Sequence, residues 1–404
     1  MTRPSVSRRT LLTASAAAPI VSWLASASPA GATPATTPGL GPVKWDHHLR
    51  STPDNLHWGG FPIGMTPGVT MKSGEVVRVD ALSQQGLTGS LHPVDYMAQF
   101  GIKPEEVLED GIKFWETLPA RSAANQNYAG GHIMTGPIYI EDAEPGDTLA
   151  IEYLALDTRV DYGFNGTSPT SGVMSHTYPG YRPGDTDLDI PSDLASRTHM
   201  YRSGIRRGKE VIHFSDTIKI PTQKFMGTIA VAPPTGEFVG ATVDAPPPPT
   251  GVQPSTEPGK YGGNMDNRQL TIGTTLYLPV FQPGAQVFMG DSHSVQGDGE
   301  VSQTAVEHSL SGTFRMTVLK NTVTELPWAE NDIHWMIMGI DWDLDRATRI
   351  AVLKTIDFLG RTQGMTVAQA YSLASLAVNY HVTEVVDKTQ VVTGYIPKSV
   401  FTAS

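Results

Sequence analysis

Residues 276–300 read LYLPVFQPGAQVFMGDSHSVQGDGE. Two apolar runs, 276–280 and 287–289, are separated by the pair Pro283-Gly284. Glycine after proline suits a turn that needs a positive φ, so this stretch predicts two strands joined by a turn. The second strand then runs directly into a segment rich in Gly, Asp, His, Gln and Glu.

The same order of turn glycine and strand recurs at 72–77 and 144–149. Residues 76–80 (VVRVD) and 138–141 (IYIE) alternate apolar and polar side chains, as half-buried strands do. Glycine (40 residues) and proline (31 residues) are abundant, which favours many short strands joined by turns over a helical bundle. We therefore expect a mainly β fold.

Helical spacing is concentrated near the C-terminal end of the sequence. Residues 343–359 and 367–380 repeat apolar side chains at helical intervals, and Thr366 is placed to cap the second helix. A last strand is expected at 390–396. This part of the chain is predicted to be a smaller α+β portion.

Residues 1–32 are typical of an export signal. They contain SRRTLL at 7–12, then an Ala-rich apolar stretch, and small residues up to Ala32. The arginine pair resembles the twin-arginine signal, which a receptor reads. We expect export by that route, to a periplasmic or secreted location. Residues 33–42 are rich in Pro, Gly and Thr and are expected to be a linker.

Composition limits the function classes. The formal net charge of −11 disfavours a nucleic-acid or anionic-membrane surface. Downstream of the N-terminal segment, no apolar run is long enough to cross a bilayer. The chain has no cysteine, which excludes disulfides, thiolate catalysis and Cys-ligated metals. Any metal must therefore bind His, carboxylate, amide or backbone oxygen ligands.

The densest set of such ligands follows the strand at 287–289. Asp291 and His293 are two residues apart and would project to the same side of an extended chain, where both can contact one ion. Asp298 and Glu300 follow, and neighbouring carboxylates need a cation, a proton or solvation. An ordinary solvated loop of Asp-Gly turns explains the same pattern.

Two histidines stand out elsewhere in the sequence. His57 precedes Trp58 and two glycines, and His132 lies in a glycine-rich turn before a strand. Each could act as a metal ligand or as an acid/base group, but each, taken alone, is better explained as a structural histidine. No nucleophile elbow, phosphate-binding loop or dinucleotide fingerprint is present in the sequence.

Several motifs in order resemble one known family, the acetamidase/formamidase family. They extend from about residue 55 to residue 400, and the pair at 263–300 is the most specific. These motifs are, in chain order, His57-Trp58, Gly131-His132 with Thr135-Gly136-Pro137, Ala143-Glu144-Pro145-Gly146-Asp147, Ala232-Pro233-Pro234, Gly263-Asn264-Met265-Asp266, Leu276 to Val280, Gly290 to Glu300, and Ala370-Tyr371.

The resemblance implies a jelly-roll-like β-sandwich with a smaller α+β C-terminal portion. We expect a β-sandwich domain at 43–245 and an α+β portion at 246–404, which begins with the proline run at 246–249 and carries the main metal-site motifs. The resemblance also implies an enzyme that hydrolyses the C–N bond of small amides to a carboxylate and ammonia. A divalent metal, zinc foremost and calcium as the alternative, and a homodimer are expected with it.

Roles follow as a hypothesis. Metal ligands are expected at Asp266, Asp291 and His293, with His57 or His132 as a further ligand. Glu300 is the expected base, and His132 is a second acid/base candidate. Asn264 and Gln296 are expected to orient the substrate amide or the oxyanion. Spacing does not decide which carboxylate contacts the ion.

Two other functions fit the same sequence. One is an exported, metal-containing carbohydrate-binding module, with Tyr178, Tyr181 and Tyr201 as stacking residues. The other is an amidase or lactamase for larger or cyclic amides, which would differ in pocket size.

Overall fold

The computed structural model describes residues 43–128, 130–175, 191, 193–237 and 251–402. These described residues belong to one compact unit. The predicted signal at 1–32, the linker at 33–42 and the proline run at 246–249 lie outside them. Among the described residues, no helix combines the length and the apolar character needed to cross a membrane.

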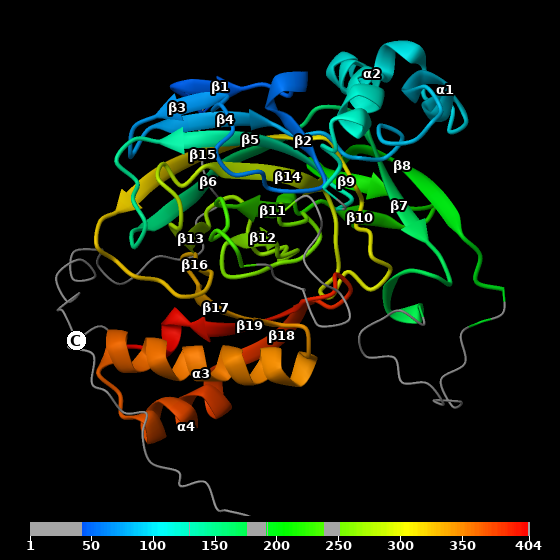
Figure 1. The fold of residues 1–404 in the computed structure, drawn as a ribbon. Coiled ribbons are helices and arrows are strands. Elements are labelled where there is room, and N and C mark those ends of the chain that lie inside the picture. Colours follow the sequence, from blue (N-terminus) through cyan, green and yellow to red (C-terminus); the bar gives the residue numbers. More distant parts are fainter. Residues whose placement is uncertain (1–42, 129, 176–190, 192, 238–250, 403–404) are drawn as a thin grey trace, which may run out of the picture. The chain divides into compact units, whose positions relative to one another are not determined.

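Three sheets dominate the structure (Figure 1). The largest has, in spatial order, β1 (His47–Leu49), β4 (Val76–Asp80), β15 (Leu310–Leu319), β6 (Thr148–Thr158), β13 (Thr275–Pro279), β16 (Trp328–Glu330), β17 (His334–Asp341), β19 (Gln390–Pro397) and β18 (Asn379–Glu384). The second has β12 (Gly262–Asn264), β11 (Phe225–Ala230), β14 (Val287–His293), β5 (Ile133–Ile140) and β2 (Leu56–Trp58), with β3 (Val69–Met71) paired to β5. The third has β10 (Lys219–Pro221), β9 (Lys209–His213), β8 (Arg197–Arg206) and β7 (Tyr162–Thr167).

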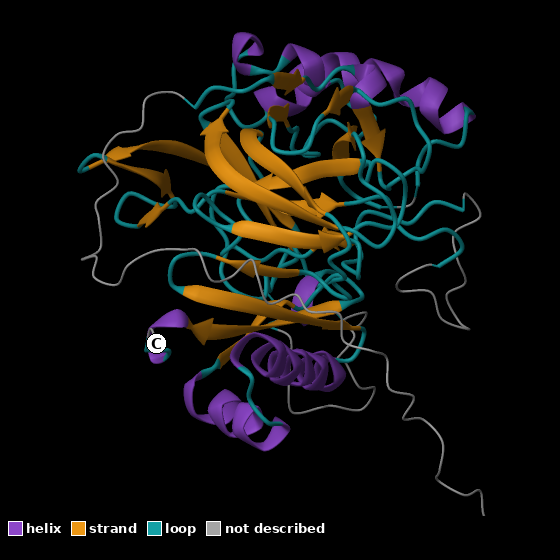
Figure 2. Ribbon diagram, turned by 90° about the vertical axis from the view of Figure 1, so that its left-hand side faces the viewer, coloured by secondary structure: helices purple, strands orange, loops and turns teal. Residues whose placement is uncertain are grey.

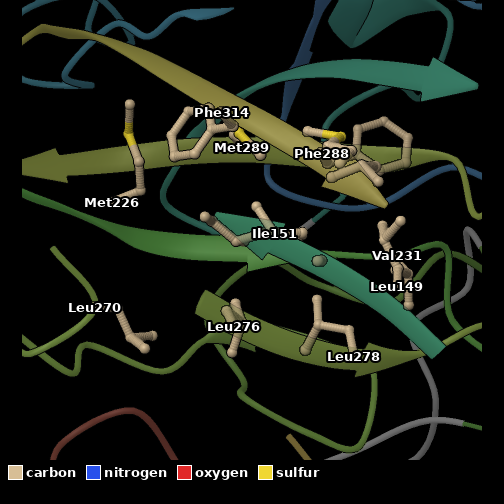
Figure 3. Packing of buried hydrophobic residues seen from close by; sticks show 14 of the residues in the cluster. Leu149, Ile151, Met226, Val231, Leu270, Leu276, Leu278, Phe288, Met289 and Phe314 are labelled. Atoms are coloured by element: carbon tan, nitrogen blue, oxygen red, sulfur yellow. The ribbon is translucent and has the colours of Figure 1, made fainter. Parts of the chain in front are cut away.

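The main core lies between the first and second sheets (Figure 3). Leu149 and Ile151 of β6 project into the same cluster as Phe288 and Met289 of β14, and all four are fully buried. Side chains of two facing sheets pack in this way in a β-sandwich, and their burial is the main favourable contribution to folding. The predicted mainly β fold class is confirmed.

The C-terminal part has the expected mixed character (Figure 2). Helix α3 (Leu344–Gln363) packs against β17, β19 and helix α4 (Val367–Ala377), and α4 also packs against β19. Asp343 caps α3 and Thr366 caps α4, each through its side chain. The prediction that the first helix ends before Gly360 was wrong. The helix continues to Gln363, because the left-handed residue that ends it is Gly364, with φ 65°.

Two further helices, α1 (Pro93–Ala98) and α2 (Glu109–Ala123), precede β5 in the chain. Strands from both sides of the predicted boundary at residue 245 alternate in the two larger sheets. Strand β6 lies between β15 and β13, and β11 lies between β12 and β14. The portions expected at 43–245 and 246–404 therefore share their sheets.

Strand β14 changes character along its length. It begins with Val287 and Phe288 in the core and ends with Asp291, Ser292 and His293, yet each of its residues is buried. Its neighbours β11 and β5 cover both of its edges. Polar side chains at such a position need partners inside the protein, so the end of β14 is where a functional site is to be sought.

Candidate active site

The end of β14 and the residues after β12 bring together the three predicted metal ligands. Nε2 of His293 lies 3.2 Å from Oδ1 of Asp291, and Nδ1 of His293 lies 3.7 Å from Oδ1 of Asp266. One ligand atom from each of the three residues lies within 4.8 Å of the others. The two sequence segments that carry them, near 264–266 and 291–293, thus meet at one point.

The segment after β14 adds two glutamates. Oε1 of Glu300 lies 4.0 Å and Oε1 of Glu307 lies 3.3 Å from Nε2 of His293. Backbone pairing brings both glutamates next to His293. Glu307 forms an antiparallel bridge with His293, and Gly299, which precedes Glu300, forms a parallel bridge with Glu384. The second bridge brings the turn between β18 and β19 to the same place, where Asp266, Glu300, Glu384 and Asp387 converge within 4.8 Å.

The backbone is held in a rarely used conformation at three of these residues. The φ values of Asp266, Asp291 and Glu300 are 43°, 49° and 46°. They lie in the left-handed region, which residues other than glycine seldom adopt. Backbone strain of this kind persists where the surrounding structure enforces it, often at functional sites.

Glycine at position 227 is required by the same arrangement. A Cβ there would lie 2.4 Å from Oδ1 of Asp266 and 2.8 Å from Oδ2 of Asp291. The backbone of β11 therefore approaches the two carboxylates so closely that only glycine fits at position 227.

Electrostatics in this cluster are governed by burial and by neighbouring acids. Burial, and next the charge of Asp266, raise the pKa of Glu300 well above its usual value. Burial and the charge of Asp291 do the same to the pKa of Asp266. Burial opposes a charged imidazole at His293, but the carboxylates of Glu307 and Asp291 raise its pKa well above 6.5. The carboxylates of this cluster lie so close together that their mutual repulsion must be offset by bound cations or protons.

The donor atoms of the three predicted ligands fit a divalent metal. Within the described part of the chain, both carboxylate oxygens of Asp266, Oδ1 of Asp291 and Nε2 of His293 are buried without a hydrogen-bond partner. Buried polar atoms are nearly always satisfied, and a bound cation would satisfy these four. Imidazole nitrogen with carboxylate oxygen is a donor set that zinc accepts.

The two predicted amide side chains contact the ligands themselves. Oε1 of Gln296 lies 3.0 Å from Nδ1 of His293, and its Nε2 donates to the backbone oxygen of Asp266. Asn264 donates from Nδ2 to Asp387 and accepts a hydrogen bond from Thr228 at Oδ1. Both amides therefore orient acidic or imidazole groups, and the oxygen of each is occupied within the protein.

His132 lies beside the cluster. Its Nε2 is 3.7 Å from Oδ2 of Asp291, and its Nδ1 is 3.3 Å from the backbone oxygen of Ser255, which accepts the Nδ1 proton. The side chain keeps 12% of its surface exposed, whereas that of His293 is fully buried. His132 is thus the most exposed of the predicted site residues.

His57 has other surroundings. Its Nε2 donates to the backbone oxygen of Gly136 at 3.2 Å, and its ring packs edge-on against Phe288. Burial, helped by the charge of Arg121, lowers its pKa to about 4. His57 is not in any of the converging ligand groups of the described residues, so a structural role replaces the ligand role expected from the sequence.

One family profile matches the C-terminal part of the chain, which carries most of this cluster. Residues 252–403, which include Asp266, His293, Glu300 and Asp387, match the sequence profile described as the Acetamidase/Formamidase family. This part of the chain is similar to the acetamidase/formamidase family.

Proteins from several organisms are similar to this chain. A putative formamidase of Schizosaccharomyces pombe is 28% identical over 48% of this chain and 53% of its own length. A formamidase of Methylophilus methylotrophus is 25% identical over 67% of this chain and 77% of its own length. The crystal structure of an acetamidase from Yersinia enterocolitica superposes with a TM-score of 0.67 at 26% identity, covering 88% of this chain and 93% of that one. The chain spans about half the length of the first of these relatives.

Sequence reasoning missed three acids that the tertiary structure brings to the site: Glu307, Glu384 and Asp387. One signal was available, because Glu384 and Asp387 interrupt an otherwise apolar strand-like run, HVTEVVD at 381–387. Of the tyrosines considered for carbohydrate stacking, Tyr178 and Tyr181 lie outside the described residues, and Tyr201 stacks on Phe214 at 5.3 Å.

Proposed function

We propose that this chain is a metal-dependent amidohydrolase that cleaves the C–N bond of small linear amides, such as formamide and acetamide, to a carboxylate and ammonia. The observation that carries the proposal is the meeting of Asp266, Asp291 and His293 with their donor atoms unpartnered. The similarity of residues 252–403 to the acetamidase/formamidase family and the names of the similar proteins support the substrate class.

Amide hydrolysis sets three requirements. The carbonyl must be polarised, a nucleophile must form near neutral pH, and the nitrogen must gain a proton before it leaves. Asp266, Asp291 and His293 would hold the metal, zinc in this proposal. When bound, such a cation supplies Lewis-acid polarisation of the carbonyl and makes water more acidic.

Proton transfer falls to the residues around the ligands. Glu300 is the proposed acceptor of the proton from water, because its buried carboxylate lies next to the three ligands, with Oε1 4.0 Å from Nε2 of His293. His132, which is partly exposed and close to Asp291, is the proposed donor to the leaving nitrogen. Gln296 keeps His293 in place by accepting its Nδ1 proton, as second-layer partners of metal-binding histidines do.

The decisive assay measures ammonia release from formamide and acetamide by the purified protein. We expect release that a chelator abolishes and added zinc restores. Retained glycan affinity with no turnover of any amide would instead favour the carbohydrate-binding module. Turnover restricted to lactams would favour the cyclic-amide alternative.

The role of Glu300 is tested separately. Glu300→Gln keeps the shape and removes the basic carboxylate, so kcat should fall by about 100-fold or more while zinc content stays unchanged. Loss of zinc together with activity would make Glu300 a ligand of that ion. Glu257→Gln, which changes a buried acid paired with Lys388, is the control and should leave zinc content unaltered.

Export and assembly complete the proposal. The arginine pair at Arg8 and Arg9 is proposed to direct the chain through the twin-arginine route to a periplasmic or secreted location. Replacing both arginines by lysine should leave the protein in the cytoplasmic fraction. The proposed homodimer is tested by sedimentation of the purified protein, where a monomer mass would contradict it.

A further inference from the structure

A groove lined by two tryptophans is bounded by α2 and β2. Its volume is about 390 Å³, which is in the range of small-ligand sites. One wall is Trp58 of β2, another is the loop at 88–90, and the third is α2 between Trp115 and Ser122. Of the described residues that line the groove, none belongs to the converging ligand groups around His293. The groove is therefore a site separate from the acid cluster.

The two tryptophans are held in place by the protein itself. Both are half-buried and pack against one apolar cluster. Nε1 of Trp115 donates to the backbone oxygen of Gly89 at 2.8 Å, and the ring of His92 lies edge-on to Trp115 at 5.1 Å. Trp58 is fixed in β2, where it pairs with Ile133 of β5. Little side-chain entropy is therefore lost when a ligand enters the groove.

The charge at the groove is negative. Among the described residues that line it, Glu116 is the only charged one, and it is exposed. Lys113, on the preceding turn of α2, pairs with Glu109 at 2.6 Å. The formal net charge of the chain, −11, also attracts cations to its surface. Charge complementarity therefore favours a cationic ligand.

We infer that this groove binds a small organic cation of the quaternary ammonium class, with the indoles of Trp58 and Trp115 against its methyl groups and the carboxylate of Glu116 near its charge. The face of an indole ring attracts a cation electrostatically. A quaternary ammonium has no N–H group, so aromatic walls can replace its water without leaving a donor unsatisfied. A neutral ligand of the same shape would gain the apolar contacts but not this attraction.

That difference is the basis of the first test. Titration calorimetry of the full chain at low ionic strength compares choline with its neutral isostere, in which a tert-butyl group replaces the trimethylammonium group. We expect choline to bind about 10-fold more tightly or better, since two indoles and one acid each contribute to the difference. Equal affinity for the two ligands would overturn the inference. Binding of glucose without binding of choline would overturn it as well.

A tryptophan variant assigns the binding to the groove. Trp115→Leu keeps an apolar side chain but removes the indole face, so choline affinity should fall by about 10-fold or more. Trp342→Leu is the matched control, because Trp342 is 59% exposed and does not line the groove. Thermal unfolding establishes that both variants are folded. Unchanged choline affinity in Trp115→Leu, or an equal loss in the control, would contradict the assignment.

An acid variant tests the charge and does not disturb the core. Glu116→Gln should weaken choline binding by about 2-fold to 5-fold at low ionic strength, and by less in high salt, because an exposed charge is screened. Glu105→Gln makes the same charge change at an exposed residue outside the groove and should leave the affinity unaltered. Equal losses in the two variants would mean that the overall charge of the chain, and not Glu116, attracts the cation.

These readouts are independent of the proposed reaction. Choline binding without amide turnover would retain the groove and reject the reaction. Amide turnover without choline binding would retain the reaction and reject the groove.

Discussion

Nδ1 of His293 lies 3.0 Å from Oε1 of Gln296, and Nε2 on the other side of the ring lies 3.2 Å from Asp291 and 3.3 Å from Glu307. A proton on Nδ1 leaves a lone pair on Nε2, which is the form of imidazole that a metal needs. Gln296 therefore selects the tautomer of His293.

Gln296→Ala should weaken zinc binding by about 10-fold to 100-fold, because the ring loses its partner and its fixed tautomer. Competition against a zinc-binding dye measures this change. Gln282→Ala serves as the control, since Gln282 bonds to Pro233 and Thr235 on the surface and its loss should not alter zinc affinity. Equal zinc affinity in wild type and Gln296→Ala would exclude the orienting role.

Gly227→Ala should abolish metal binding or unfold the protein, because the added Cβ would overlap the carboxylates of Asp266 and Asp291. Overpacking of this kind costs about 1–3 kcal/mol or more. Gly297→Ala, in the segment after β14, meets nothing within 4 Å and should be tolerated. Metal content and thermal unfolding of the two variants should differ clearly, and similar behaviour would refute the close-approach argument.

Asp291 and Asp298 are seven residues apart in the sequence but have different surroundings: Asp291 lies in the buried cluster, and Asp298 forms partly exposed ion pairs. Asp298 accepts from Nε of Arg268 at 2.8 Å and lies 2.9 Å from Nδ1 of His381. Asp291→Asn should lose zinc, whereas Asp298→Asn should keep it and lose about 1 kcal/mol of stability or less, as expected of a partly exposed ion pair. Zinc retained in Asp291→Asn would remove Asp291 from the ligands.

The buried His57 should make stability depend on pH. Its pKa is about 4 in the folded protein, against about 6.5 in the unfolded chain, so the unfolded chain binds the extra proton between these values. The free energy of unfolding should therefore fall as pH decreases from about 7 to 4, by about 3 kcal/mol from this residue.

His57→Gln isolates that contribution, because glutamine can donate to Gly136 but does not titrate. Denaturant unfolding at several pH values should show a shallower dependence for the variant than for wild type. Parallel curves for the two proteins would mean that His57 does not titrate as its burial implies.

Much of the fold could be predicted from local patterns. The turn and strand order around Pro283-Gly284, the cap at Thr366 and the final strand all depend on near neighbours in the sequence, and the structure has each of them. The end of α3 was predicted before Gly360 but lies four residues later, at Gln363. Gly360 remains helical, and only Gly364 adopts the left-handed conformation that ends the helix.

The candidate site was predicted only in part. Asp291, His293 and Glu300 are close together in the sequence, and their density marked the site. His57 was chosen for its neighbours in the sequence, but pairing of β2 with β5 places it against Gly136 and Phe288. Gln296 and Asn264 were expected to face the substrate, whereas their buried amides bond to ligands and acids.

By itself, the sequence determined a mainly β chain without thiol chemistry and with metal-ligand residue types at the end of one strand. Only the tertiary structure decided which acids share that site. Glu384 and Asp387 reach it because Gly299 pairs with Glu384 across more than 80 residues of chain. Such long-range pairing is set by the packing of whole sheets, which leaves no local pattern to read.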